Sequence, residues 1–368
     1  MPASRRASRA FERLATEHPA RAAVGAAAAG AAAAGVAAAG RAVADRLRPD
    51  DGGGPSRGYR LKRKEKPADG IRRIAAGRAE SALAHLGSAD SGSVAEPVHE
   101  ARKDLKKLRS ALRLARPHLD EATYARENDR FRQVGRALGG ARDAEVKLET
   151  LRLLAARYED DFPAEACERL SSALADDRDR LTKELKDDES GARQWAAEEL
   201  RAGRTIAGEW PIDADGWELI EPGLRRSYRR GRNRFKEVHE DPSPTAVHEW
   251  RKRVKDLWYH LRVVRDAWPE VIGELSDQTH ELADLLGDHH DLTVLAEEVA
   301  GRKDLLSASD RRRVQSLIRR RQKELLVPAL RLGTRIYADK PKHFARRMGE
   351  YWHAWRPDGV RAASPAHA

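Results

Sequence analysis

The sequence contains a single cysteine, Cys167, in 368 residues. One cysteine excludes a disulfide within the chain and any metal site built from several thiolates. It fits a reducing, cytoplasmic setting. We expect Cys167 to be a buried or neutral residue of a helix.

Aromatic residues are also scarce, at 5% of the chain. The eight tryptophans lie mostly at helical core spacing or at predicted helix ends, so we interpret them as packing residues. Binding of single-stranded nucleic acid needs aromatic side chains interleaved with a basic groove, and this pattern counts against it. Binding of a duplex through its phosphates stays open.

The usual signatures of phosphoryl and acyl transfer are missing. The sequence has no Gly-rich phosphate loop, no Gly-x-Ser-x-Gly elbow and no carboxylate cluster for Mg²⁺. A hydrolase would need some such group to activate water. We therefore expect no catalytic residue and no cofactor, and a phosphohydrolase remains a minor alternative.

One segment, residues 287–291, is dense in potential metal ligands (Gly-Asp-His-His-Asp). Its counterpart earlier in the chain, residues 139–143, lacks both histidines, so we expect no metal site there. Asp143 and Asp291 are expected to orient or pair with a neighbouring arginine. The alternative is a structural role, in which each aspartate follows a glycine and caps a helix.

Long hydrophobic runs are absent, with one partial exception. Residues 22–40 are uncharged Ala, Gly and Val, and 19 residues approach the ~20 that span a bilayer. The residues that drive insertion, Leu, Ile and Phe, are missing from it. We favour a flexible or loosely helical arm over a marginal membrane segment, and residues 1–56 are assigned as arm and linker.

Charge is abundant. Lys and Arg number 70 against 59 Asp and Glu, a net charge of +11 that favours anionic partners. From Arg57 onward the apolar residues recur with a helical period, which predicts an all-α fold. The expected helices cover 67–87, 96–116, 120–157, 162–207 (broken around 190–191), 214–239, 245–267, 269–300 and 307–355 (interrupted around 339–341).

The chain contains an internal duplication. The pattern Val-His-Glu-x-Arg-Lys begins at Val98 and again at Val247. Two further blocks keep the same order in both halves: 70–73 matches 223–226, and 138–143 matches 286–291. The repeat predicts two tandem, pseudo-symmetric four-helix bundles with long, partly broken helices. They would cover residues 57–210 and 211–358, with 359–368 as a tail.

On a helical wheel, both copies of the motif place an apolar stripe beside a cationic band. Five positions keep residue type and azimuth between the copies: His99 and His248, Arg102 and Arg251, Lys103 and Lys252, Lys106 and Lys255, Arg113 and Arg262. Arg and Lys are phosphate-binding side chains, and a histidine can donate to phosphate or gain charge near neutral pH. An extended polyanion such as a phosphate chain fits this cationic band. A solvated face stabilised by i,i+4 pairs is the alternative, but it needs alternating signs.

This candidate site includes further cations from the same helix, from the preceding helix of each half, and from the matching segments 138–143 and 286–291, each of which we call a glycine block. They are Arg109, Arg72, Arg73, Arg225, Arg226, Arg229, Arg232, Arg142 and His290.

These motifs, with the Gly-Leu-Arg-Arg-Ser-Tyr-Arg-Arg-Gly-Arg run at 223–232, resemble the CHAD domain, the conserved histidine α-helical domain. The resemblance covers roughly residues 59–356. It implies two pseudo-symmetric bundles around a basic groove that binds inorganic polyphosphate, often at polyphosphate granules. It also implies that His99, Arg102, Lys103, Lys106, His248, Arg251, Lys252 and Lys255 line that groove.

The signature of the triphosphate-tunnel enzymes often fused to such domains, Glu-x-Glu-x-Lys, is not found. Binding without catalysis is therefore the main prediction. The alternative is a protein that binds nucleic acid or an anionic membrane surface. Weak nucleic-acid binding is a secondary expectation, and membrane association is not expected.

Overall fold

The computed structural model describes residues 58–88, 94–188 and 190–357. Across these ranges the chain forms eleven α-helices and two short 3-10 helices, with no strand, so the predicted all-α class is confirmed. The stretch 22–40, the rest of the arm and the tail 359–368 lie outside the described residues. No helix in the described ranges is long and apolar enough to cross a membrane.

The helices follow in this order: α3 (Pro67–Ser88), α4 (Ala95–Ala115), η3 (Arg116–His118), α5 (Glu121–Ala137), α6 (Gly140–Arg157), α7 (Ala164–Asp187), α8 (Ala192–Gly208), α9 (Gly216–Glu240), α10 (Pro244–Val263), η4 (Arg265–Ala267), α11 (Pro269–Gly301), α12 (Ala308–Ile336) and α13 (Pro341–Trp355).

The structure confirms both of the helix breaks that the sequence predicts. A break separates α7 from α8, where Asp188 and Gly191 both take left-handed backbone angles. Another separates α12 from α13, which begins at Pro341. The single helix expected over 120–157 is wrong, because α5 ends at Ala137 and α6 begins at Gly140.

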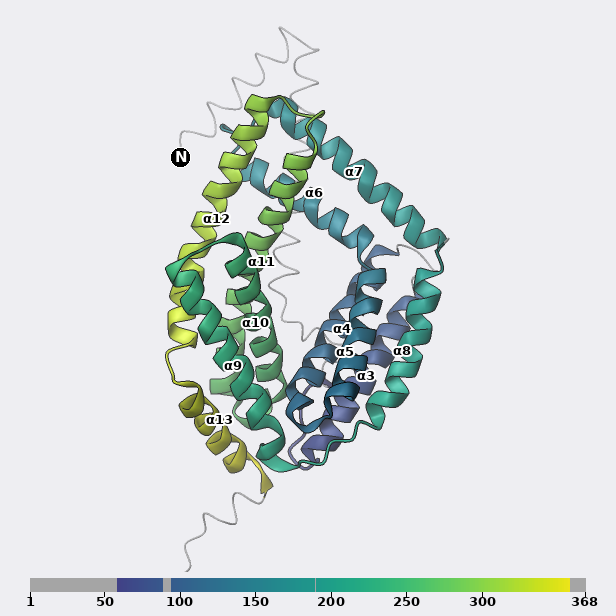
Figure 1. The fold of residues 1–368 in the computed structure, drawn as a ribbon, viewed down its shortest axis with the longest axis vertical. Coiled ribbons are helices and arrows are strands. Elements are labelled where there is room, and N and C mark those ends of the chain that lie inside the picture. The colour runs from purple at the N-terminus through teal and green to yellow at the C-terminus, as the bar shows by residue number, and fades with distance from the viewer. Residues whose placement is uncertain (1–57, 89–93, 189, 358–368) are drawn as a thin grey trace, which may run out of the picture.

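The pairing of helices repeats along the chain. α3 packs against α4 as α9 packs against α10, α3 against α8 as α9 against α13, and α6 against α7 as α11 against α12. In Figure 1, α9, α10 and α13 lie on one side and α3, α4, α5 and α8 on the other. The motif helices α4 and α10 also pack directly against each other, so the two copies of the motif meet at the middle of the molecule.

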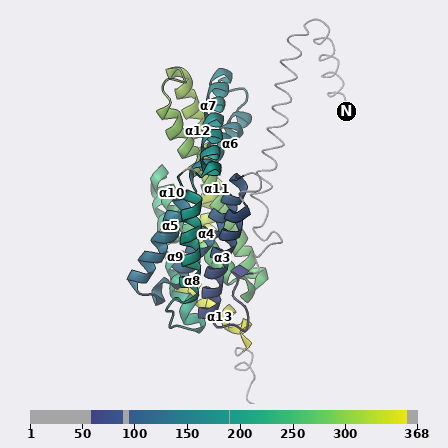
Figure 2. The ribbon, with the colours of Figure 1, turned by 90° about the vertical axis from the view of Figure 1, so that its right-hand side faces the viewer.

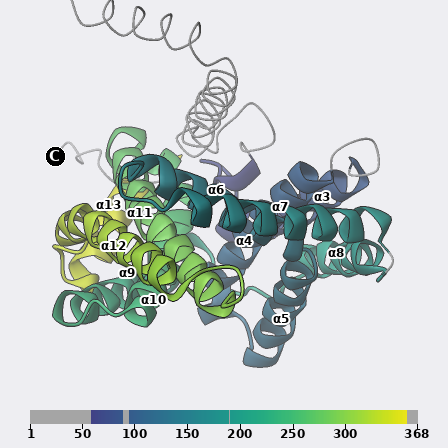
Figure 3. The same ribbon diagram turned by 90° about the horizontal axis from the view of Figure 1, so that it is seen from above.

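The hydrophobic core consists of two clusters, and neither is confined to one repeat. The larger cluster includes Trp210, Trp250 and Trp352, all fully buried, and takes residues from α3, α4, α9, α10 and α13. The smaller cluster joins α6 and α7 to α11 and α12. In Figure 2, α6 and α7 stand above α3, α4, α5 and α8, and from above they cross between the two sides (Figure 3). Both clusters therefore draw on both sides of residue 210, and each core ties the two repeats together.

Candidate anion-binding site

The motif helices place their side chains as the wheel predicts. In α4 the stripe Val98, Ala101, Leu105, Leu108 and Leu112 is buried, and in α10 so is the stripe Val247, Trp250, Val254, Leu257 and Leu261. Ser243 caps α10 by accepting a hydrogen bond from the Ala246 N–H. Burial of one stripe fixes the rotation of each helix, and the cationic band next to it is thereby held near the junction of α4 and α10.

Lys106 and Lys255 are the equivalent lysines of the two copies, and they lie close enough to affect each other. Burial, followed by the charges of Arg251 and Lys106, holds the pKa of Lys255 well below its usual value. Burial, followed by Arg102 and Arg251, lowers the pKa of Lys106 to about 8. Lys106 is nevertheless exposed at its surface.

Arg142 of α6 and Arg251 of α10 complete this group. The Nε atoms of both are buried and have no hydrogen-bond partner. Lys106, Arg142, Arg251 and Lys255 form no hydrogen bond or ion pair with any acceptor of the described residues. We call these four residues the central cation cluster. Desolvation lowers the pKa of Lys106, Arg251 and Lys255, so a group of unpaired cations at this place is an electrostatically costly arrangement that an anion would stabilise.

Arg102 is held differently, by the glycine block. Its Nη1 donates to the Gly139 carbonyl at 3.1 Å and to Asp143 Oδ1 at 3.0 Å. The predicted pairing of Asp143 with a neighbouring arginine is thus confirmed. The same contact lies at the break between α5 and α6.

In the second repeat the corresponding residues are Arg251 and Asp291, and the helix that contains Asp291 is not broken there. Asp291, Asp284 and Asp288 act on Arg251 through space, although desolvation still lowers its pKa. α11 runs uninterrupted through Gly287, beside which Arg251 lies. Asp284 and Asp288 were not singled out from the sequence. Their spacing from Asp291 on α11, with Asp288 one helical turn earlier and Asp284 two turns earlier, was the available signal.

Three histidines border the cluster. Burial and the charge of Arg142 lower the pKa of His99 to about 3, and burial and Arg251 lower that of His290 to about 3. The Nδ1 atoms of His248 and His290 are 3.1 Å apart, with ring centroids at 4.3 Å. At neutral pH these rings are uncharged, so one Nδ1–H donates to the other Nδ1. Each ring keeps its Nε2 for another partner.

The cations near these histidines disfavour a bound metal ion. Arg251 and Lys252 both lower the pKa of His290. No group of three or more metal-ligating side chains occurs in the part of the chain that the structure describes.

Lys103 and Lys252 are less available than the wheel indicates. Lys103 Nζ lies 2.7 Å from Glu100 Oε1, and Lys252 Nζ lies 2.6 Å from Glu249 Oε1. These i,i+3 pairs belong to the motif itself, since both copies contain the glutamate. They reduce the net charge that the two lysines present.

Several predicted site residues serve the fold instead. Arg72 donates to the Trp210 and Ile212 carbonyls, and Arg73 to the Gly58 and Arg60 carbonyls and to Glu65. Arg232 donates to the Tyr337 carbonyl. Arg262 is buried over the rings of Tyr59 and Trp258. These arginines hold connecting segments against helices, which the sequence alone did not reveal.

The remaining predicted cations lie along α4 and α9. Arg109 contacts Asn128, and burial lowers its pKa to about 10. Arg225 pairs with Glu221 at 3.2 Å, and Arg229 is exposed. Arg113 and Arg226 line a separate small cavity.

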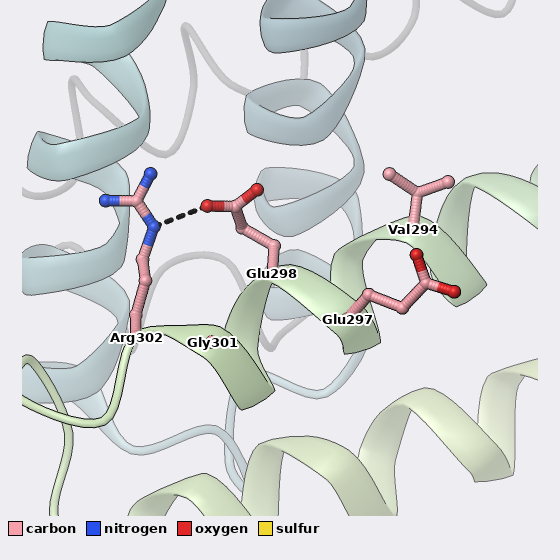
Figure 4. Close-up of a pocket in the computed structure, with 5 residues that line it drawn as sticks. All are labelled: Val294, Glu297, Glu298, Gly301 and Arg302. Atoms are coloured by element: carbon pink, nitrogen blue, oxygen red, sulfur yellow. Dashed lines mark hydrogen bonds and ion pairs between the residues drawn. The ribbon is translucent and has the colours of Figure 1, made fainter.

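Another hollow lies at the end of α11, where ion pairs connect α11 to α6 and α7. It is lined by Val294, Glu297, Glu298, Gly301 and Arg302, and Figure 4 shows Arg302 reaching Glu298. Lys147 of α6 pairs with Glu298 at 2.7 Å, and Arg302 also pairs with Asp177 of α7. Because acids pair with both of its cations, Lys147 and Arg302, it lacks the unpaired positive charge of the central cation cluster.

The family model for the CHAD domain matches residues 73–300, which is more than half of the chain and runs from within α3 to the last turn of α11. The chain belongs to the CHAD-domain family. The match includes both motif helices and all four members of the central cation cluster.

Two solved structures support the CHAD assignment at the level of the fold. The CHAD domain from the plant Ricinus communis superposes with a TM-score of 0.54 and 18% identity, covering 76% of this chain and 94% of that one. PptA from Streptomyces chartreusis gives a TM-score of 0.55 and 14% identity, covering 75% of this chain and 100% of that one. No curated protein matches the sequence.

Proposed function

We propose that this CHAD protein binds inorganic polyphosphate without catalysing its hydrolysis, at the central cation cluster and its border of histidines. One observation carries the proposal: Lys106, Arg142, Arg251 and Lys255 meet from both repeats and have no acidic hydrogen-bond or ion-pair partner among the described residues. Polyphosphate granules are the cellular setting that the family resemblance suggests.

The composition of the cluster favours phosphate oxygens over carboxylates or metals. Arginine offers several donors in a fixed fork, and lysine adds a mobile point charge. The free Arg142 and Arg251 Nε–H groups are unused donors in buried positions. Neutral His99 and His290 add donors whose geometry is set by their neighbours.

The cluster also favours a polymer over a single phosphate. Cations continue along α4 through Arg102, Lys106 and Arg109, one turn apart. A linear chain of phosphates can contact several of them at once, and each contact releases condensed counterions. Binding should therefore be strongly salt-dependent.

Binding rather than hydrolysis is supported by the state of the histidines. Positive neighbours and burial keep the pKa of His99 and His290 near 3, far from the value near neutrality that suits a general base.

The test is a titration of the purified protein with long-chain polyphosphate, followed by calorimetry and by release of orthophosphate. We expect saturable binding and no phosphate release above the protein-free rate. Absence of binding refutes the proposal. Binding accompanied by phosphate release refutes its non-catalytic part and favours a phosphohydrolase.

A further inference from the structure

A second cation-rich cavity lies away from the central cation cluster, between α4, α5, α9 and α10. Five arginines line it: Arg113, Arg116, Arg226, Arg230 and Arg253. The rest of the lining includes Tyr124, Ser227 and His260, and a single acid, Asp256. We call this the arginine cavity.

The single acid does not balance the arginines. Asp256 pairs with Arg113 at 2.8 Å and with Arg253 at 3.0 Å. Arg226 and Arg230 have no hydrogen-bond or ion-pair partner in the described part of the chain. Burial and the charge of Arg116 lower the pKa of Arg226, and burial and Arg253 lower that of Arg230. Two guanidinium groups are thus held next to other cations, and the nearby acids Glu121 and Asp256 act on them only through space.

Arg116 is fixed by contacts of its own. It pairs with Glu121 at 3.0 Å and lies over the Tyr124 ring, 4.2 Å from the centroid. Its position is therefore set before any ligand arrives, which reduces the entropy that binding must remove.

The backbone around the cavity is also fixed. At Gly223 a Cβ would lie 2.1 Å from the Leu114 carbonyl oxygen, so α9 approaches α4 as closely as a glycine allows. Buried His260 joins the same elements, with Nε2 donating to the Ser110 carbonyl at 3.0 Å and Nδ1 3.0 Å from Ser227 Oγ. The arginines therefore project from a rigid floor.

The internal repeat shows that this cavity is not required by the architecture. By the offset of 149 residues, Arg113, Arg253 and Asp256 correspond to Arg262, Asp104 and Lys107. These three corresponding residues are buried, and Asp104 lies near Lys107 and pairs with Arg78 at 3.1 Å.

Tyr59 covers that equivalent position. Its hydroxyl donates to the Lys107 carbonyl at 3.2 Å, and Arg262 lies 5.4 Å from the centre of its ring. One copy of this position is therefore closed and carries acid next to base, whereas the other copy, the arginine cavity, is open and carries an excess of arginine. A difference of this kind is expected where the open copy has a ligand.

We propose that the arginine cavity binds a compact phosphoanion, a free pyrophosphate or the terminal phosphates of a chain, with Arg226 and Arg230 as the principal ligands. Forked guanidinium donors match tetrahedral phosphate oxygens and can contact one group from two sides. The cavity is small and its one accessible ring, Tyr124, is already covered by Arg116, so a nucleobase finds no stacking surface. The chain-end form of this inference rests on the proposed function, and the free-pyrophosphate form does not.

The test compares two double variants by calorimetry with inorganic pyrophosphate as the probe. Arg226→Gln with Arg230→Gln removes the two unpaired arginines, and Arg225→Gln with Arg229→Gln removes the same charge from the same helix outside the cavity. We expect wild type to bind pyrophosphate, the first variant to lose at least tenfold in affinity, and the second to change less than twofold. A helical circular-dichroism spectrum verifies folding of both.

Two results overturn the inference: no binding of pyrophosphate by wild type, or an equal loss in both double variants. The variant Lys106→Gln with Lys255→Gln should keep its pyrophosphate affinity, so failure of polyphosphate binding alone refutes the proposed function and leaves this inference intact. Polyphosphate with both ends capped as phosphoramidates separates the two sources. Weaker binding than uncapped chains assigns the cavity to chain ends, and equal binding assigns it to free pyrophosphate.

Discussion

Neutralising the central lysines tests the site quantitatively. The variant Lys106→Gln with Lys255→Gln removes two cations that meet from the two repeats and that have no acidic partner in the described structure. Both side chains are held in place by α4 and α10, whose buried stripes remain unchanged. We therefore expect the variant to fold as wild type does and to lose affinity for polyphosphate.

The size of the effect follows from the number of phosphate contacts. For a single-stranded polyanion each neutralised phosphate contributes about 0.7 to the slope of log K against log salt. Removing both lysines should reduce that slope by about 1.4. A charged hydrogen bond contributes about 1.5 kcal/mol, so the pair should lower affinity on the order of a hundredfold at moderate salt.

The assay is calorimetry or fluorescence titration with long-chain polyphosphate at four salt concentrations. Lys236→Gln with Lys342→Gln is the matched control, because it removes the same charge from exposed positions on α9 and α13. A slope that falls equally in both double variants would show that only net charge matters, and would refute the assignment of the central cation cluster as the site.

Lys103 and Lys252 provide a graded comparison. Each already pairs with a glutamate of its own helix, Glu100 and Glu249 respectively. Changing both to glutamine should reduce affinity less than changing Lys106 and Lys255. A larger loss would mean that these ion pairs open on binding.

Three further outcomes are expected. Polyphosphate affinity should fall as pH rises from 7 to 9, because the pKa of Lys106 is about 8 in the free protein, and Lys106→Arg should flatten this dependence in titrations at fixed salt. Stability should fall as pH drops from 6.5 to 4, because burial lowers the pKa of His260 to about 4 and the unfolded state then binds the proton first. The loss approaches about 3 kcal/mol and should shrink in His260→Gln, measured by urea unfolding. Gly231→Ala should destabilise the fold by about 2 kcal/mol or more, since a Cβ there would lie 2.3 Å from the Tyr337 hydroxyl, whereas Gly77→Ala at the equivalent open position should be neutral or stabilising. An unchanged melting temperature in Gly231→Ala would contradict the packing described.

Much of the fold could be predicted because it depends on local patterns. Helical periodicity located most of the helices, and Pro341 and the 188–191 turn mark two of the interruptions. The third interruption, at Leu138 and Gly139, was missed because the same Leu-Gly pair continues as a helix in α11. The Gly139 carbonyl accepts from Arg102, a contact between distant residues that no local pattern encodes.

The site was only partly predictable for a similar reason. The repeat identified Lys106 and Lys255 as equivalent, and pairing of Asp143 with an arginine followed from the glycine block. The same reasoning included Arg72, Arg73 and Arg262, which bind carbonyls or rings of segments outside the repeat. A helical wheel gives the direction of a side chain, but not the partner that a connecting segment brings to it.

Selectivity for polyphosphate over nucleic acid is the central claim. The direct measurement is the affinity of wild type for long-chain polyphosphate and for duplex DNA of equal phosphate content, at two salt concentrations. We predict tighter binding of polyphosphate at both, because the central cation cluster gathers four unpaired cations from α4, α6 and α10 in one compact group, which a flexible phosphate chain can follow more closely than a wide duplex can. Equal affinity for the two polymers would contradict the account.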